Sequence, residues 1–268
     1  MVFPGKLFLQ NLIKNRSLIY QLVRRDFEQR YVGSVAGWLW GIVHPLVLLG
    51  VYTFVFAYAF GMRLPRGEVT DSYPLFLFAG MLPWLLFSET LQRSSSALID
   101  QANLIKKTVF PAEIIPLSIF LSTWISHLLG LILLVVIVGI QDHEINASLL
   151  LLPGYFLLLG MLSLGLAWIT AALNVYLRDT AQVLSVVLTA WFWLTPIFLF
   201  EAQFPESVSG VLLLNPLTYV VRGYRECILG GELPSGEDFL VLTSFALMTF
   251  IAGGLFFRHA KRGFADVL

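Results

Sequence analysis

One apolar stretch, residues 112–140, carries a line of small polar side chains that could bind or conduct. Three serines recur at every fourth position, with a threonine and a histidine beside them: Ser118, Ser122 and Ser126, then Thr123 and His127. This spacing places the serines on one face of a helix. In a membrane, such a face either packs against another helix or lines a wet path. Both interpretations remain open for the serines, and His127 favours the path.

Aromatic residues are the second group that could do chemistry, at 14% of the chain with seven Trp. An interfacial belt at helix ends explains Trp38, Trp40, Trp84 and Trp168. Sugar rings also suit aromatic faces, because their C–H faces are apolar while their edges are polar. Ordinary lipid-facing or core positions are the alternative for each residue. The candidate lining of a glycan path consists of Tyr52, Phe56, Tyr58, Trp84, Trp124, His127, Trp191 and Trp193.

Several kinds of enzymatic site are absent from the sequence. It contains no G-x-x-x-x-G-K-[ST], H-E-x-x-H or G-x-S-x-G motif, so no P-loop, zincin or hydrolase site is expected. The four histidines lack ligand spacing, and a single cysteine, Cys227, excludes an intrachain disulfide. We therefore predict no catalytic residue, no metal and no cofactor in this chain. Energised transport would need ATP hydrolysis on another chain.

The elements that must position these residues are membrane helices. Hydrophobic residues make up 57% of the 268 and charged residues 13%, against about 25% charged in soluble domains. A hydrocarbon core of about 30 Å needs roughly 20 apolar residues per crossing. The sequence therefore predicts an all-α integral membrane protein with six transmembrane helices. We expect them at 36–60, 73–92, 112–140, 151–174, 181–200 and 238–257.

Three further segments are not expected to span. Residues 6–31 mix apolar and basic side chains at helical spacing, which favours a helix in the headgroup plane or one packed on a partner protein. We therefore divide the chain into residues 1–35, with this interface helix, and a membrane domain, residues 36–268. Short apolar runs broken by Asn215 and Pro216 indicate a re-entrant or interfacial hairpin at 208–230. The polar loop at 93–113 is helix-capable, and is either a solvated connector or a rigid contact for a partner.

The basic residues orient the chain. If the N-terminus is cytoplasmic, 13 of the 17 Lys and Arg lie inside and four lie outside. Since cytoplasmic loops are enriched in Lys and Arg, we expect both termini inside and an even number of spans. The four outside residues are Arg63, Arg66, Arg222 and Arg225. The zero net charge gives no general attraction to nucleic acid.

Four stretches together resemble the permease subunit of type-2 ABC exporters for polysaccharides, the O-antigen, capsule and teichoic-acid group. They are RRDFEQRYVGSVAGWLWGIVHPL at 24–46, GMLPWLLFSETLQRSSSALIDQANLIKKTVFPAEIIPL at 80–117, LNVYLRDTAQVL at 173–184, and LTPIFLF with LNPLTYVVRGYRECIL at 194–200 and 214–229. The likeness covers nearly the whole chain. His44 stands where the family often has Asn, a departure confined to one helix contact.

The resemblance implies a homodimer in the bacterial inner membrane with two copies of a separate ATPase subunit, which binds Mg-ATP. It implies that the cargo is a lipid-linked polysaccharide. The coupling contact to the ATPase would be Asn103, Leu104, Ile105, Lys106 and Lys107, with Arg178 and Asp179 nearby. The site for the lipid diphosphate would include Arg24, Arg25, Arg30 and Tyr31. The periplasmic gate at 208–230 would contain Asn215, Pro216, Tyr219, Arg222 and Arg225.

Other functions remain open. A type-2 ABC permease for a drug, lipid or peptide would share these features. A membrane glycosyl- or acyltransferase would need clustered carboxylates or a histidine pair at one membrane face, and the sequence shows neither. Anchoring on anionic lipid is the alternative role for Arg24, Arg25 and Arg30.

Overall fold

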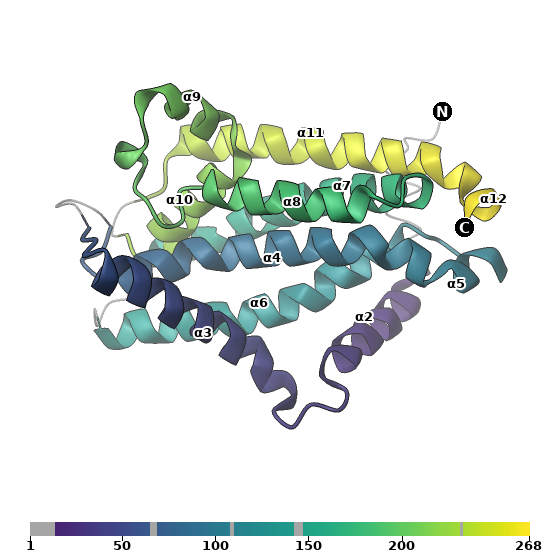
Figure 1. Ribbon diagram of the computed structural model, residues 1–268, viewed down its shortest axis with the longest axis horizontal. Helices are drawn as coiled ribbons and strands as arrows, with labels where there is room; N and C mark the ends of the chain where they lie inside the picture. The colour runs from purple at the N-terminus through teal and green to yellow at the C-terminus, as the bar shows by residue number, and fades with distance from the viewer. Residues whose placement is uncertain (1–13, 65–68, 108–109, 142–146, 231–232) are drawn as a thin grey trace.

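The described chain is a bundle of helices (Figure 1). The computed structural model describes residues 14–268 apart from 65–68, 108–109, 142–146 and 231–232. No β-strand occurs among them, so the all-α prediction is confirmed. Five helical segments of this part are long and apolar enough to cross a membrane: Gly37–Ala59, Tyr73–Asp100, Ile114–Ile140, Ala147–Tyr176 and Gly236–Gly263.

The centre of the bundle is α4 (Tyr73–Asp100), which is buried along most of its length. Three helices pack around it: α6 (Ile114–Gln141), α7 (Leu152–Tyr176) and α10 (Pro216–Ile228). A short 3₁₀ segment, Ala147–Leu151, precedes α7. The large apolar residues of α4, such as Phe78 and Phe87, are fully buried. This helix therefore forms the centre on which several of the elements that carry candidate site residues pack.

The tightest helix pair is α7 with α11 (Gly236–Ala260). A Cβ on Gly253 would lie 2.1 Å from the carbonyl oxygen of Gly165, so only glycine permits this approach. Small residues at helix interfaces let backbones come close where lipid supplies no hydrophobic driving force. Ser163, Ala167 and Ala171 of α7 are fully buried, as a packing seam requires.

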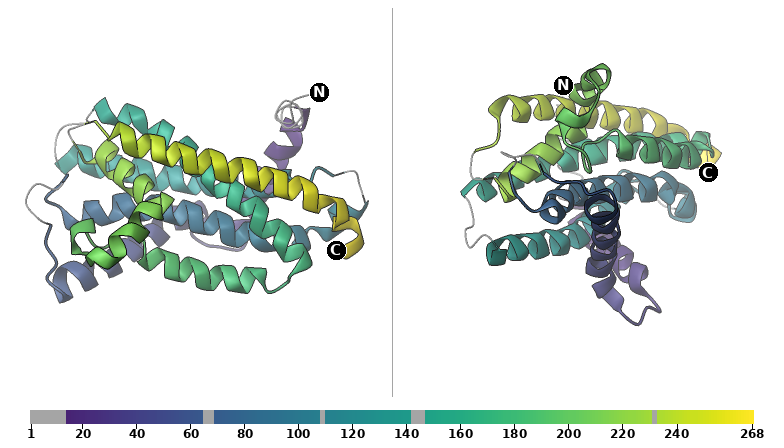
Figure 2. Two further views of the ribbon diagram at one scale, coloured as in Figure 1. Left: turned by 90° about the horizontal axis from the view of Figure 1, so that it is seen from above. Right: turned by 60° about the vertical axis from the view of Figure 1, so that its left-hand side comes forward.

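Two elements project from one side of the bundle (Figures 1 and 2). They are α2 (Arg16–Tyr31), which lies against α6, and a continuous segment made of Gly37–Leu39, α3 (Trp40–Thr53) and the π-helical Phe54–Ala59. Gly33 and Gly37 between them have φ of 77° and 53°, which glycine adopts without strain. The predicted helix at 6–31 is thus present from residue 16, and residues 6–13 lie outside the described residues.

The predicted boundaries after residue 92 were wrong. The helix expected to end there continues to Asp100, and after Gln101 a short helix, α5 (Ala102–Lys107), follows. Ala97 and Leu98 of the extension are buried in a small core with Ile115 and Phe264. This packing makes residues 93–100 continuous with the membrane helix, whereas the sequence predicted them as part of a separate helix-capable loop.

The helix predicted at 181–200 also differs. The observed α8 (Thr180–Trp193) ends seven residues earlier, before Pro196, which has no N–H to continue a helix. Its 14 residues span about 21 Å, less than the hydrocarbon thickness of about 30 Å. The six-span count therefore remains a prediction, whereas five long apolar helices are present.

The segment predicted as a hairpin at 208–230 is two helices. They are α9 (Glu206–Leu214) and α10, with a short 3₁₀ turn, Glu201–Gln203, before them. Asn215 separates the two and caps α10, because its side chain accepts a hydrogen bond from the Leu217 N–H. The chain ends in a 3₁₀ turn, Lys261–Gly263, and α12 (Phe264–Val267), which packs against α5 and α7.

Candidate functional site

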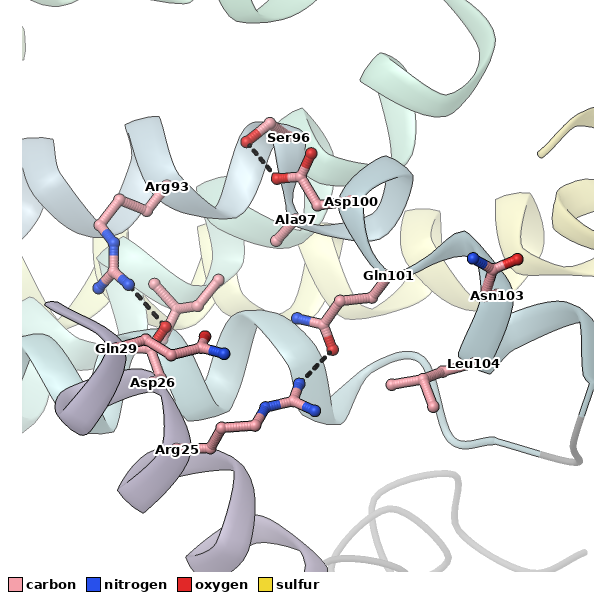
Figure 3. A pocket seen from close by; sticks show the side chains of 11 residues that line it. Arg25, Asp26, Gln29, Arg93, Ser96, Ala97, Asp100, Gln101, Asn103 and Leu104 are labelled. Carbon is pink, nitrogen blue, oxygen red and sulfur yellow. Dashed lines mark hydrogen bonds and ion pairs between the residues drawn. The ribbon is translucent and has the colours of Figure 1, made fainter. Parts of the chain in front are cut away.

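A polar pocket of about 460 Å³ lies between α2, α4 and α5 (Figure 3). The residues that line it are Arg25, Asp26, Gln29, Arg93, Ser96, Ala97, Asp100, Gln101, Asn103, Leu104 and Ile119. Arg25 Nη2 donates to Gln101 Oε1 at 3.4 Å, which joins α2 to the break between α4 and α5. The pocket therefore brings Arg25, predicted for lipid diphosphate, beside Asn103 and Leu104, predicted for ATPase coupling.

The other predicted coupling residues lie at the same end of the molecule (Figure 1). Asn103 and Lys106 are exposed on α5, while Ile105 packs on the small core of α4, α6 and α7. Arg178 and Asp179 are exposed in the turn between α7 and α8. The Lys107 side chain is outside the described residues. The α5 helix therefore exposes polar side chains while Ile105 holds it on the bundle, an arrangement suited to contact with a soluble partner.

Four charged residues join α2 to α4 beside this pocket. The Arg93 guanidinium lies 2.6 Å from the Asp26 carboxylate and 3.7 Å from that of Glu89. Arg30 pairs with Glu89 at 2.8 Å and approaches Asp26 at 3.7 Å. We call Asp26, Arg30, Glu89 and Arg93 the α2–α4 charge network. It contains two cations and two carboxylates, so its formal charge is zero.

A second pocket, of about 400 Å³, lies on the other side of Arg30 between α2, α3, α4 and α6. Its lining comprises Arg30, Trp40, Gly41, His44, Pro45, Leu82, Leu85, Leu86, Ser88, Glu89, Gln92, Thr123, Ser126 and His127. We call it the Arg30–Glu89 pocket. Arg30 donates to Thr123 Oγ1 at 2.6 Å and to Ser126 Oγ at 3.3 Å.

The polar residues predicted in 112–140 therefore fall into two sets, one that lines a pocket and one that packs inside the bundle. Thr123, Ser126 and His127 line a pocket. Ser118 donates to the Ile115 carbonyl of its own helix, and Ser122 is fully buried. His127 Nε2 lies 3.2 Å from the Tyr224 hydroxyl, which connects the stripe to α10.

The residues predicted for the lipid diphosphate do not converge on one point. Arg24 is exposed and pairs with Glu28 at 2.7 Å, and this carboxylate raises the pKa of Arg24. Arg25 lines the first pocket, and Arg30 lines the second. The Tyr31 side chain is outside the described residues. Their common role stays a prediction.

Most of the predicted glycan-path aromatics form one cluster between α3, α4 and α8. Phe198, in the turns after α8, contacts the rings of Tyr52, Phe56, Phe192 and Trp193. Trp84 contacts Phe192, and Trp191 contacts Phe87. The belt interpretation was wrong for Trp84 and Trp168, because both are buried in the bundle.

Three predicted path residues lie outside this cluster. The rings of Trp124 and His127 stack on Phe156 of α7, on the opposite side of α4. Tyr58 is exposed at the end of the segment that contains α3. The structure thus separates the eight candidates into a five-member group, a pair and one surface residue.

The predicted gate residues are held by a set of hydrogen bonds. Asn215 accepts from Trp191 Nε1 at 2.8 Å and donates to the Leu194 carbonyl and Thr195 Oγ1. Pro216 is the first residue of α10, where its missing N–H costs nothing. The Tyr219 hydroxyl donates to the Leu213 carbonyl at 2.8 Å. The end of α8 and both helices of the hairpin are therefore joined through side chains.

Arg222 and Arg225 of α10 are bound in different ways. Arg222 pairs with Glu201 and, at 2.8 Å, with Asp238, and these carboxylates raise its pKa. Arg225 is buried and donates to the carbonyls of Phe76, Pro196 and Ile197 at 3.1, 2.8 and 2.8 Å.

The sequence analysis did not identify the carboxylates that pair with Arg30, Arg93 and Arg222. Asp26 and Glu89 each precede an arginine by four residues, the spacing of a helical ion pair. That spacing could have identified both as members of a charged site. Glu201 and Asp238 lack such a signal, because each lies at least 16 residues from Arg222.

Comparison with known proteins gives a consistent family. Residues 17–229 match the family described as ABC-2 type transporter. The O-antigen export system permease protein RfbA of Myxococcus xanthus is 29% identical over 96% of this chain and 98% of its own length. A protein of the same name from Klebsiella pneumoniae is 30% identical over 94% of this chain and 95% of its own. The polysialic acid transport protein KpsM of Escherichia coli is 27% identical over 88% and 91%.

Proposed function

Because this chain belongs to the ABC-2 type transporter family, we propose that it is the membrane permease subunit of an ATP-driven polysaccharide exporter. The observation that carries the proposal is the near-full-length likeness to export permeases whose names specify O-antigen or polysialic acid. Five apolar helices long enough to cross a membrane support a transport role.

The cargo in this proposal is a lipid-linked polysaccharide of the O-antigen or capsular type. The aromatic cluster around Phe198 lies along α3, α4 and α8, and its member Trp193 is exposed, so that this ring is the one to which sugar C–H faces would pack. Arg24 and Arg25 are exposed on α2 and have the charge that a lipid diphosphate requires. Arg30 has the same charge but is already paired with Glu89.

The partner in this proposal is a separate ATPase that binds Mg-ATP, since the sequence contains no P-loop motif. Its docking face would comprise exposed Asn103 and Lys106 of α5, the mouth of the first pocket with Arg25, and the Arg178–Asp179 turn. All belong to the end of the bundle that contains α5 and α12. This end would be cytoplasmic, in agreement with the 13 basic residues expected inside the inner membrane.

The functional unit would be two copies of this chain with two ATPase subunits. The segment Gly37–Ala59 is almost unburied within one chain, and α8 leaves Val183, Val186 and Val187 exposed. Apolar surface of this kind is covered by lipid or by a second copy. A homodimer would place the aromatic cluster of each copy near the junction.

The test is complementation of a bacterial strain that lacks its O-antigen export permease. This chain, expressed with an ATPase subunit that co-purifies with it, should restore polymer at the cell surface. A Lys106→Glu variant should lower export and co-purification of the ATPase, whereas Arg258→Ala at another exposed cation should not. Normal membrane insertion without any surface polymer, combined with transport of a drug or peptide, would contradict the proposed cargo.

A further inference from the structure

The Arg30–Glu89 pocket has polar walls but a neutral charge balance. Its two fully charged lining residues pair with each other at 2.8 Å. Thr123 and Ser126 occupy two more donors of the guanidinium. An anionic group that entered would meet the Glu89 carboxylate beside an arginine that is already paired. Like-charge repulsion at such distances is unfavourable in a partly buried site.

The lining offers many hydrogen-bonding groups in a small volume. Ser88, Glu89 and Gln92 come from α4, while Thr123, Ser126 and His127 come from α6. An acyl chain here would leave these groups without water, at a cost for each of them. A group that can both donate and accept at several points is the better occupant.

One wall of the pocket adds an apolar plane. Trp40 of α3 lines it and is 50% exposed within one chain. A volume of about 400 Å³ falls within the range of roughly 300–1,000 Å³ found for small-molecule pockets. An indole face beside carboxylate, amide and hydroxyl groups complements a ring that has apolar faces and a polar edge.

We propose that the Arg30–Glu89 pocket binds a neutral, hydroxyl-rich group, namely a sugar ring carried on a lipid anchor. This inference rests on the proposed function and gives the pocket a role in recognising the sugar rather than the diphosphate. Trp40 supplies the ring contact, and Glu89, Gln92 and Ser126 bind hydroxyl groups. The pair of Arg30 with Glu89 keeps the wall polar without attracting an anion.

Binding to the complete exporter complex in nanodiscs tests this assignment. One probe is a short prenyl diphosphate that carries one N-acetylglucosamine, and the other is the same diphosphate without sugar. Gln92→Leu and Trp40→Ala should each weaken binding of the first probe about five- to tenfold. Binding of the bare diphosphate should stay within about twofold. Trp38→Ala is the matched control, because Trp38 is equally exposed but does not line the pocket.

Glu89→Gln separates sugar from phosphate. A sugar occupant predicts that the sugar-bearing probe loses affinity relative to the bare diphosphate, because the variant weakens an acceptor for hydroxyl groups while the released Arg30 can attract either diphosphate. An equal change for both probes would overturn the proposal, because it would show that only the diphosphate responds to Glu89. Equal loss for both probes in Gln92→Leu and Trp40→Ala, or no loss for either, would overturn it as well.

Two further measurements identify the lipid that carries the sugar. They also distinguish a failure of the pocket assignment from a failure of the proposed export function. Vesicles with a glucosyl diacylglycerol that bind with the same variant dependence would support a sugar on a membrane glycolipid. Binding restricted to the prenyl-linked probe would support the export substrate. If the wild-type chain restores surface polymer but the variants leave probe binding unchanged, the pocket assignment fails and the export function stands. If it restores no polymer, the export function fails.

Discussion

The two ends of α4 are bound to their neighbours in different ways. In its first turn, the Phe76 carbonyl accepts a hydrogen bond from buried Arg225, together with the carbonyls of Pro196 and Ile197. About 20–25 Å further along the helix axis, Glu89 and Arg93 share ion pairs with Asp26 and Arg30 of α2. We compare the first set, the carbonyl site of Arg225, with the second, the α2–α4 charge network.

The two sites differ in whether an arginine can exchange one hydrogen-bonding partner for another. Backbone carbonyls have fixed positions, and the Arg225 guanidinium also lies 3.4 Å from the centre of the Phe76 ring. In the charge network, each arginine reaches both carboxylates, at one short and one longer distance. Side chains can exchange these contacts without moving a helix backbone. The carbonyl site therefore holds α10 rigidly on α4, whereas the network lets α2 shift relative to α4.

Loss of the Arg225 side chain is the change with the largest expected effect. Arg225→Ala leaves three buried carbonyls without this donor and a void beside Phe76. We expect a loss of about 3–5 kcal/mol in stability, measured as thermal unfolding of the purified protein in detergent. Arg258→Ala, at an exposed arginine, should change stability by less than about 0.5 kcal/mol. A loss below about 1 kcal/mol for Arg225→Ala would contradict the conclusion that the carbonyl site of Arg225 holds α10 rigidly on α4.

A methyl group added at Gly80 tests by steric pressure whether the carbonyl site of Arg225 is rigid. A Cβ at this position would lie 2.8 Å from Arg225 Nη2, which is already bonded to the Ile197 carbonyl. Gly80→Ala should therefore cost about 1–3 kcal/mol, although alanine favours helices more than glycine does. Gly50→Ala is the control, since a Cβ there meets nothing within 4 Å. Stabilisation by both variants would show that Arg225 can move aside.

Arg30→Ala tests the α2–α4 charge network, whose ion-pair partners can exchange. We expect a smaller stability loss than for Arg225→Ala, about 1–2 kcal/mol, because Arg93 can still pair with both carboxylates. Export of polymer should fall while membrane insertion stays normal. Arg24→Ala removes an exposed ion pair of the same helix and should leave stability nearly unchanged. Equal losses for Arg30→Ala and Arg225→Ala would remove the distinction between the two ends.

The smallest expected effect concerns Glu226, one residue after Arg225. Burial raises the pKa of its carboxyl group, and Asp238 adds to this, while Arg222 opposes it. A raised folded-state pKa means that stability falls as pH rises from the unfolded value through the folded one. Glu226→Gln should therefore slightly stabilise the protein at neutral pH and flatten its unfolding profile at pH values above the ordinary range of a glutamate carboxyl group. A steeper profile in the variant would contradict this.

The sequence predicted most of the helices because hydrophobic length is a local property. Five of the predicted spans correspond to observed helices, and the turn at Asn215 lies where Asn and Pro interrupt an apolar run. The ends of α4 and α8 were not predictable in this way. Residues 97–98 are helical because they pack on Ile115 and Phe264, which are distant in the sequence.

The candidate site was predictable only in part for the same reason. Arg30 became a functional candidate through the resemblance to polysaccharide exporters, but its contacts to Glu89 and Thr123 join residues 59 and 93 positions away. Charge type can be read from a sequence, whereas neutralisation of that charge by a particular carboxylate depends on how the helices pack. The separation of the eight path candidates into a five-member group, a pair and Tyr58 depends on the same packing.

The 28-residue helix α4 continues without a break through Pro83, from the turn that carries Phe76 to the turn that carries Arg93. A hydrogen-bonded helix neither lengthens nor shortens appreciably under small loads. A displacement of its α5 end along the axis therefore reaches Phe76 without delay on the timescale of domain motion. Probes attached near Gln101 and near Tyr73 should thus report their movements simultaneously in single-molecule records, rather than one after the other.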